Sequence, residues 1–253
     1  MKDPIVVYVI RDVHHEDRRS KLVGLFKDDD FHVIIPDIGY DITETPDNVY
    51  NRHEAYQVGW CLADAKENYP TQPVLIIKDS SLCVADPDTI SEVVYSSLNA
   101  GGNFHICYLG RWNDKCHLHS KRKKIRGTMS HVAKTQSPHG VQALLFSVMG
   151  RDVVLGLKPM KNGKFFKARE SISRTLNLNI VRGNLDAFCV VPNLIAYDIS
   201  LAQEDEDYLK ANECTTVLGF GNTNSNSINI YVAVLVIIIL LILIVWAAIS
   251  VSP

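Results

Sequence analysis

The feature that most constrains this chain is an apolar stretch at residues 230–249, IYVAVLVIIILLILIVWAAI, which contains no charge and no proline. About 20 residues rising about 1.5 Å each match the roughly 30 Å hydrocarbon core of a bilayer. Tyr231 and Trp246 lie near its two ends, where interfacial aromatic residues are common. A buried helix or strand pair in a soluble domain does not need such length and uniformity. The stretch therefore predicts one transmembrane helix.

The position of the predicted span also predicts a topology and a division of the chain. The N-terminal segment MKDPIVVYVIRD is not a signal peptide, because its apolar run is short and charged residues follow at once. We expect post-translational insertion, with the large N-terminal domain facing the cytosol and residues 250–253 as a short tail. Residues 1–212 are long enough for one α/β domain. Residues 213–229 include the uncharged segment GFGNTNSNSIN and are expected to form a flexible linker.

Charge and cysteine content narrow the class of protein. The 26 basic and 28 acidic residues give a net charge of −2, so no global positive field indicates nucleic-acid binding. The six cysteines show no C-x-x-C spacing, which argues against a redox motif. Those within or beside apolar runs are predicted to be buried free thiols, typical of a reducing compartment: Cys61, Cys83, Cys107 and Cys189.

Apolar runs rich in Val and Ile alternate with helical patterns along residues 1–212. The runs are typical of strands buried on both faces, expected at residues 5–10, 31–36, 73–77, 104–109, 140–148 and 187–191. Helices are expected after the first strand and at residues 51–68, 87–100 and 164–176. Trp60 is expected on the inner side of its helix, and residues 110–139 are expected to form a long loop. The alternation predicts an α/β fold, a mostly parallel sheet covered by helices on both faces and closed by the last strand.

Five segments of the chain contain these strands and helices in order: VIRDVHHEDRRSKLVGLF, HEAYQVGWCLADAKENYPTQPVLIIKDSSLCVAD, HICYLG, GVQALLFSVMGRDVVLGL and FCVVPNLIAYD. In order and spacing they resemble glycosyltransferase family 25, which covers lipopolysaccharide glycosyltransferases and collagen galactosyltransferase-like domains. The resemblance covers most of residues 4–199. It implies a GT-A-like domain that binds a nucleotide sugar at the carboxyl edge of its sheet.

The acidic metal motif of that family is degraded here. The resemblance implies Glu-Asp-Asp after the third strand, where a divalent cation would bridge the donor's diphosphate. This chain has Lys78-Asp79-Ser80 in that slot. One carboxylate beside an ammonium is a poor site for Mg²⁺ or Mn²⁺. Either Asp79 is catalytic and Lys78 neutralises a phosphate without metal, or Asp79 only ends a strand in a non-catalytic domain. Asp86 is a possible second carboxylate, but it is more simply explained as a helix cap.

Basic residues after the first strand are the other candidates for nucleotide binding. Arg11, Arg18 and Arg19 lie at the edge where open α/β sheets bind ligands. The resemblance places this region beside the nucleotide, where arginines would hold phosphates with paired hydrogen bonds. The alternative is a first helical turn that simply faces solvent.

Two further patterns lie in the 110–139 segment. Cys116, His117 and His119 have the close spacing of zinc ligands, with His131 and His139 as distant partners, but a polar loop is the simpler interpretation and no metal site is expected. The only dense basic run follows them: Lys121, Arg122, Lys123, Lys124 and Arg126. It is expected to contact anionic lipid headgroups or an acidic partner protein rather than nucleic acid. A merely solvated loop is the remaining alternative.

These features favour a membrane-anchored, non-catalytic glycosyltransferase-like protein that joins a membrane to a protein assembly. The shell and internal membrane of a large DNA virus are one setting that needs such a part. The expected partners are the lipid bilayer, through the span, and capsid-like proteins, with no cofactor and no nucleic acid. The alternative is an active transferase at a membrane surface, which would need a nucleotide sugar and Mn²⁺ or Mg²⁺. A nucleic-acid tether that uses the basic run is a third, weaker hypothesis.

Overall fold

β1 (Ile5–Ile10) buries every one of its six side chains in the computed structural model, and the domain is layered on its two faces. Alternate residues of the strand pack in two different hydrophobic cores. One core contains Val6, Tyr8 and Ile10, and the other contains Ile5, Val7 and Val9. Successive side chains of a strand point to opposite faces, so the sheet carries one core on each side.

The structure describes residues 3–11, 16–38, 46–100, 104–111, 114–168 and 171–197. All of them fall in the first of the two units, Met1–Thr216 and Val217–Pro253, into which the chain divides. No helix within these ranges has the length and apolar composition of a membrane span. The linker, span and tail predicted at residues 213–253 lie outside the described residues and stay predictions.

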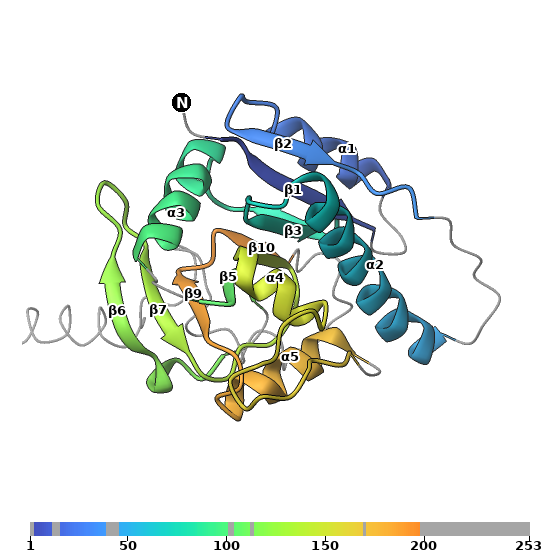
Figure 1. Ribbon diagram of the computed structural model, residues 1–253. Coiled ribbons are helices and arrows are strands. Elements are labelled where there is room, and N and C mark those ends of the chain that lie inside the picture. Colours follow the sequence, from blue (N-terminus) through green and yellow to red (C-terminus); the bar gives the residue numbers. More distant parts are fainter. Residues whose placement is uncertain are drawn as a thin grey trace, which may run out of the picture. The chain divides into compact units, whose positions relative to one another are not determined.

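Eight strands form the main sheet. Besides β1, they are β2 (Phe31–Ile34), β3 (Val74–Lys78), β5 (Ile106–Gly110), β6 (Ser120–Lys124), β7 (His131–Thr135), β8 (Ala143–Phe146) and β9 (Ala187–Val191). Their order is β2-β1-β3-β8-β5-β9-β7-β6 (Figure 1). Following the pairings across the sheet, β8 and β7 run against the other six strands, so the predicted mostly parallel sheet is confirmed. A small antiparallel sheet pairs β4 (Ser81–Cys83) with β10 (Ile195–Tyr197).

Helices cover both faces of the main sheet (Figure 1). They are α1 (Glu16–Leu25), α2 (Pro46–Asn68), α3 (Pro87–Ala100), α4 (Val148–Val154) and α5 (Ile172–Val181), with a short 3₁₀ turn, η1 (Cys116–Leu118). Apolar residues of α2, α4 and α5 pack in the core that contains Val6, and those of α1 and α3 in the core that contains Val7. The predicted covering of the sheet on both sides is therefore confirmed.

Polar caps explain where three helices begin. The Asp86 carboxylate accepts from the Thr89 amide at 2.8 Å, as predicted, and fixes the start of α3. Ser147 caps α4, and Ser171 caps α5 by accepting from the Arg174 amide at 3.3 Å. The helix predicted at residues 164–176 is therefore wrong in position, because the cap at Ser171 delays the helix to Ile172.

Three other expectations are corrected. Residues 110–139 are not one long loop, because β6 and β7 form an antiparallel hairpin within them. The strand at 187–191 does not close the sheet, since β9 lies between β5 and β7 and the outermost strand is β6. Trp60 is 36% exposed, so the expectation that it lies on the inner side of α2 is wrong; that side is formed by Val58, Cys61, Leu62 and Ala65, which are 0% exposed. The four cysteines predicted to be buried free thiols are free, and all of them are buried except Cys83, which is partly exposed.

Candidate functional site

The carboxyl ends of β1 and β3 lie side by side, because the two strands pair in parallel with Ile10 opposite Lys78. This edge holds most of the residues that the sequence singled out for nucleotide binding. The amide of Arg11 donates to Gln57 Oε1 at 2.8 Å, and Gln57 Nε2 donates back to the Arg11 carbonyl at 2.8 Å. These two bonds fix α2 against the end of β1.

Lys78 is committed to an internal ion pair. Its Nζ lies 2.5 Å from Oε1 of Glu54 on α2, and the two side chains are only 19% and 14% exposed. Such a pair holds the ammonium in place and neutralises the charge that a diphosphate would need. The sequence did not identify Glu54, because its partner is in the next strand, 24 positions away.

Asp79 is also held inside the protein. Its side chain is 0% exposed, and its Oδ2 lies 3.4 Å from Nε of Arg19. The Asp79 amide donates to the carbonyl of Ile10 at 3.0 Å, which continues the pairing of β1 and β3 past the strand end. The structure thus brings together Asp79 and Arg19, two of the residues that the sequence singled out for nucleotide binding. The carboxylate faces a guanidinium within the protein rather than solvent.

The remaining candidates at this edge have separate positions. The Arg11 side chain is exposed, and the side chain of Arg18 lies outside the described residues. Asp86 is engaged as the cap of α3, and its hydrogen bonds with the amide and hydroxyl of Thr89 lower its pKa. Asp86 therefore does not pair with Asp79 as a second metal ligand.

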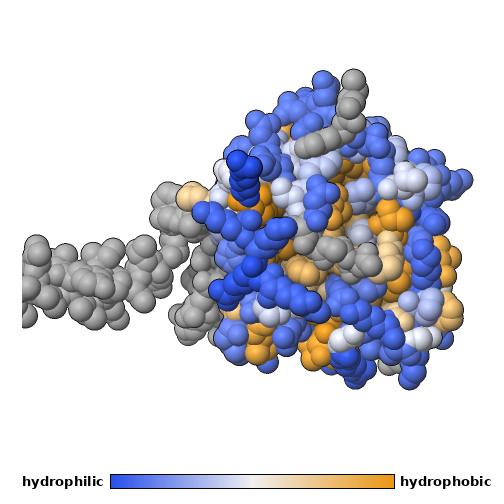
Figure 2. Space-filling model, turned by 60° about the vertical axis from the view of Figure 1, so that its left-hand side comes forward, coloured by the Kyte–Doolittle hydropathy of each residue, from blue (hydrophilic) through white to orange (hydrophobic). Residues whose placement is uncertain are grey.

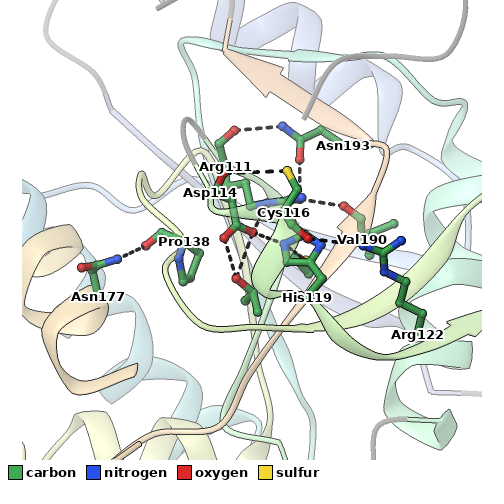
Figure 3. Close-up of polar contacts among 11 residues, drawn as sticks. Arg111, Asp114, Cys116, His119, Arg122, Pro138, Asn177, Val190 and Asn193 are labelled. Carbon is green, nitrogen blue, oxygen red and sulfur yellow. Dashed lines mark hydrogen bonds and ion pairs between the residues drawn. The ribbon is translucent and has the colours of Figure 1, made fainter. Parts of the chain in front are cut away.

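A second polar cluster, which sequence spacing did not reveal, lies beyond the end of β5 (Figure 3). Arg111 Nε donates to Asp114 Oδ2 at 2.8 Å, and both side chains are 0% exposed. Arg111 Nη1 also donates to the Val190 carbonyl and to Asn193 Oδ1, each at 2.8 Å. The side-chain Nδ2 of Asn193 donates in turn to the Arg111 carbonyl at 2.9 Å. This cluster ties β5 to the end of β9.

Asp114 is the centre of that cluster. His119 Nε2 lies 2.7 Å from Oδ2, and the Thr135 hydroxyl donates to Oδ1 at 2.8 Å. Burial acts to raise the pKa of Asp114, but the hydrogen bond with His119 and the charge of Arg111 outweigh it, so the pKa is lowered. The carboxylate therefore stays ionised inside the protein, and it is balanced by Arg111.

The cluster brings together three groups of metal-ligand type. The ligand atoms of Asp114, His119 and Cys189 all lie within 4.8 Å of one another. They do not fit a zinc ion well. A structural zinc site takes four ligands, and Asp114 Oδ2 already faces the Arg111 guanidinium. Burial raises the pKa of the Cys189 thiol, which opposes the thiolate form that a metal requires.

The arrangement also differs from a Cys-His-Asp triad. In such a triad the imidazole uses one nitrogen for the nucleophile and the other for the carboxylate. Here the same atom, His119 Nε2, lies 2.7 Å from Asp114 Oδ2 and 3.7 Å from Cys189 Sγ. No proton can be relayed through the ring in this geometry. The cluster acts as a buried structural network.

The zinc pattern suggested by sequence is not assembled. Cys116 is disulfide-bonded, so it has no thiol to ionise, and His117 is exposed. His119 instead faces Asp114, which the sequence analysis did not consider as its partner.

The basic run forms β6, a strand with five exposed residues at the edge of the sheet. Its residues pair with β7, with Lys123 opposite Val132 and Lys124 opposite His131. It lies at the opposite end of the strand order from β2, and β7, β9, β5, β8 and β3 lie between it and β1. The basic side chains therefore do not join the Lys78–Asp79 group in one site.

No protein-family profile matches the sequence, and no curated protein matches it. Among solved structures, the chain is similar to a glycosyltransferase involved in the glycosylation of the major capsid of PBCV-1, with 11% identity and a TM-score of 0.33 over 61% of this chain and 67% of that one. It is also similar to UDP-glucose pyrophosphorylase, at 9% identity, in the apo form (TM-score 0.34; 73% and 72% of the chains) and with UDP-glucose (0.31; 77% and 72%). At these values the similarity assigns neither a family nor an activity to this chain.

Proposed function

We propose that this chain is a non-catalytic, glycosyltransferase-like domain that a C-terminal helix anchors to a membrane, where it links the membrane to a protein assembly. The proposal includes descent from a family 25-like transferase. It also includes the virion setting, with the domain between an internal membrane and its capsid.

The ion pair between Lys78 and Glu54 carries the non-catalytic part of the proposal. A metal-dependent transferase needs carboxylates that reach a cation bound by the donor diphosphate. In this chain a lysine stands in the slot and is neutralised at 2.5 Å from inside the fold. Asp79 is fully buried against Arg19. Lys78 and Asp79 thus pair with Glu54 and Arg19 within the domain, which supports a structural role for them.

The active alternative requires that these pairs open. Asp79 would have to leave Arg19 and reach the surface, and Lys78 would have to exchange Glu54 for phosphate. Each change removes a charged contact from a largely buried position, where an uncompensated charge is costly. The alternative therefore predicts a rearrangement that ligand binding must drive, and it can be tested directly.

The test is donor binding by the full-length chain, purified in detergent. Thermal unfolding is followed with UDP, UDP-sugars and GDP-sugars, each with and without Mn²⁺. A ligand at 100 times its Kd would stabilise the folded state by about 2.7 kcal/mol. We expect no shift with any donor. A shift of several degrees that disappears in Asp79→Asn, while that variant unfolds normally without ligand, would establish the active alternative.

The anchoring part is tested separately by extraction of membranes with alkaline carbonate, which releases peripheral proteins. The full chain should stay with the membrane pellet, and a chain lacking residues 230–249 should move to the supernatant. Release of the full chain would disprove the anchor and leave the conclusion on catalysis untouched.

A further inference from the structure

The edge of the main sheet formed by β6 is strongly basic. All five residues of the strand are exposed, and Arg126 in the following turn is exposed as well. The whole chain has a net charge of −2, so this surface is a local concentration of positive charge: Lys121, Arg122, Lys123, Lys124 and Arg126. Figure 2 brings this side of the domain forward and shows hydrophilic side chains gathered over much of it.

The turn that joins β6 to β7 presents an apolar side chain to solvent. Met129 is 75% exposed, the largest fraction among the exposed large hydrophobic residues of the described chain. The turn is closed by the Ile125 amide, which donates to the Ser130 carbonyl at 3.0 Å. Ile125 is only 3% exposed and Val132 only 2%, so the base of the hairpin is packed in the core. Met129 is therefore held outward on an anchored hairpin.

Neighbouring charges leave the surface positive. One acid lies at the turn: Glu92 on α3, whose Oε1 would lie 3.8 Å from a Cβ at Gly127. Burial first, and then the charges of Arg122, His119 and Arg111, lower the pKa of His131 on β7. One carboxylate at the turn does not balance five basic side chains.

An acidic peptide strand, single-stranded nucleic acid and anionic lipid are all compatible with the charge, and the geometry of the hairpin separates them. A peptide strand added to the edge would need regular backbone, but the pairing of β6 shifts between Ser120 and Lys123 and Lys121 has a φ of 50°. Single-stranded nucleic acid would need aromatic side chains for stacking, and this hairpin has none. Protection of an edge strand explains lysines but not an exposed methionine.

An anionic bilayer uses both features. Basic side chains near a membrane surface are attracted to acidic headgroups, and an exposed apolar side chain among them can enter the interface. We propose that the β6–β7 hairpin is a contact surface for anionic lipid headgroups, in which the basic side chains lie on the headgroups and Met129 enters the interface. The proposal concerns a second membrane contact and does not depend on the state of the edge around Lys78.

The experiment measures hydrogen exchange of the full-length chain with lipid nanodiscs. Discs of phosphatidylcholine are compared with discs that contain phosphatidylserine, either with the chain assembled into them or with discs added to the purified chain. We expect amide exchange in residues 120–130 to slow severalfold in the anionic discs only. The slowing should vanish at about 0.5 M salt, where the Debye length is roughly 4 Å.

Two variants and a matched control make the result specific. Arg122→Gln with Lys123→Gln and Lys124→Gln should abolish the slowing, because each base near an anionic surface is worth about fivefold in affinity. Met129→Ser should reduce it and leave the salt dependence. The control, Lys21→Gln with Lys27→Gln, removes two exposed charges beside β2, at the opposite edge of the sheet, and should change nothing.

Several results would overturn the proposal. These are equal exchange in the two kinds of disc, slowing that survives the triple substitution, or equal slowing with glycerophosphoserine, the headgroup without its acyl chains. Protection by an oligonucleotide or an acidic peptide, but not by anionic discs, would assign the surface to a different partner. Carbonate extraction tests the C-terminal anchor on its own, so the two membrane contacts can fail independently.

Discussion

Nζ of Lys78, at the end of β3, lies 2.5 Å from Oε1 of Glu54, in the first half of α2, and this pair joins the sheet to the helix. Two charges that are each less than one-fifth exposed stabilise the domain only while both are present.

Removing one partner of this pair should therefore destabilise the domain. We expect Glu54→Gln to lower the free energy of unfolding by about 1–3 kcal/mol, because the ammonium of Lys78 loses its nearest counter-charge. Urea unfolding measures the change. In a double-mutant cycle with Lys78→Met, the double variant should lose less than the two single losses together. Strictly additive losses would show that the pair is not coupled.

Gly150 in α4 has no room for a side chain. A Cβ at this position would lie 1.8 Å from the His105 carbonyl oxygen, a backbone atom that cannot rotate away. Gly150→Ala should cost at least about 3 kcal/mol of stability. Gly59, in the interior of α2, is the matched control, because nothing lies within 4 Å of its Cβ position. Gly59→Ala should stabilise by about 0.5–1 kcal/mol. Equal effects at the two sites would contradict this packing.

Arg151 closes the C-terminal end of α2 from α4. Its Nη1 donates to the carbonyls of Ala65 at 3.1 Å and Tyr69 at 2.8 Å, and its Nη2 donates to that of Pro70 at 2.5 Å. A lysine cannot reach several carbonyls with a planar fork, so Arg151→Lys should cost about 2–4 kcal/mol. Arg182→Lys, at an exposed position after α5, should be nearly neutral. Thermal unfolding of the two variants measures this difference, and equal losses of stability would contradict the role of Arg151.

Asp114 should contribute to stability in a pH-dependent way. Its pKa is lowered from 3.8 in the folded state, since the hydrogen bond with His119 and the charge of Arg111 outweigh burial. Its contribution is therefore present above pH 3.8 and is lost as the pH falls through the lowered value. In Asp114→Asn the slope of unfolding free energy against pH should be smaller by up to about 1.4 kcal/mol per pH unit in that acidic range. An unchanged slope would contradict an ionised Asp114.

His105 should also make stability fall on acidification, in a pH range above that of Asp114. Its Nδ1 accepts the Asp186 amide at 2.9 Å, so that nitrogen carries no proton, and burial is the main cause that lowers its pKa from 6.5. Protons then bind more readily to the unfolded chain, and stability falls as the pH drops from 6.5 toward the lowered value. His105→Gln should flatten this part of the profile, measured by urea unfolding at closely spaced pH values. His131 and His139, whose pKa values are also lowered, set the slope that remains.

Strands were predictable where the sequence is apolar. The runs at β1, β3 and β8 are buried along their whole length or nearly so, and a continuous Val, Ile and Leu pattern shows that directly. β6 has the sequence SKRKK, with no apolar residue, and it becomes a strand only by pairing with β7. The one local signal for the hairpin is the glycine at position 127, which lies in the turn between the two strands with a φ of 82°.

The candidate site was predictable only in part. Lys78 and Asp79 were found because they are adjacent and end an apolar run. The cluster of Arg111, Asp114 and Asn193 could not be predicted, because its hydrogen bonds connect residues up to 82 positions apart. Partner choice in such a network is decided by the strand order of the sheet. That order is not encoded in local spacing.

The reversed strand β8, in the middle of the sheet, has a consequence for how the domain is made. Among the described strands, only β8 connects the ladder of β2-β1-β3 on one side with that of β5-β9-β7-β6 on the other. It also comes late in the chain, after seven of the other strands in sequence order. During synthesis, the first three strands of the sheet and the basic hairpin therefore emerge before the seam that unites them. The amides of Ala143–Phe146 should exchange only when the whole domain unfolds, since any opening of β8 parts the sheet into two.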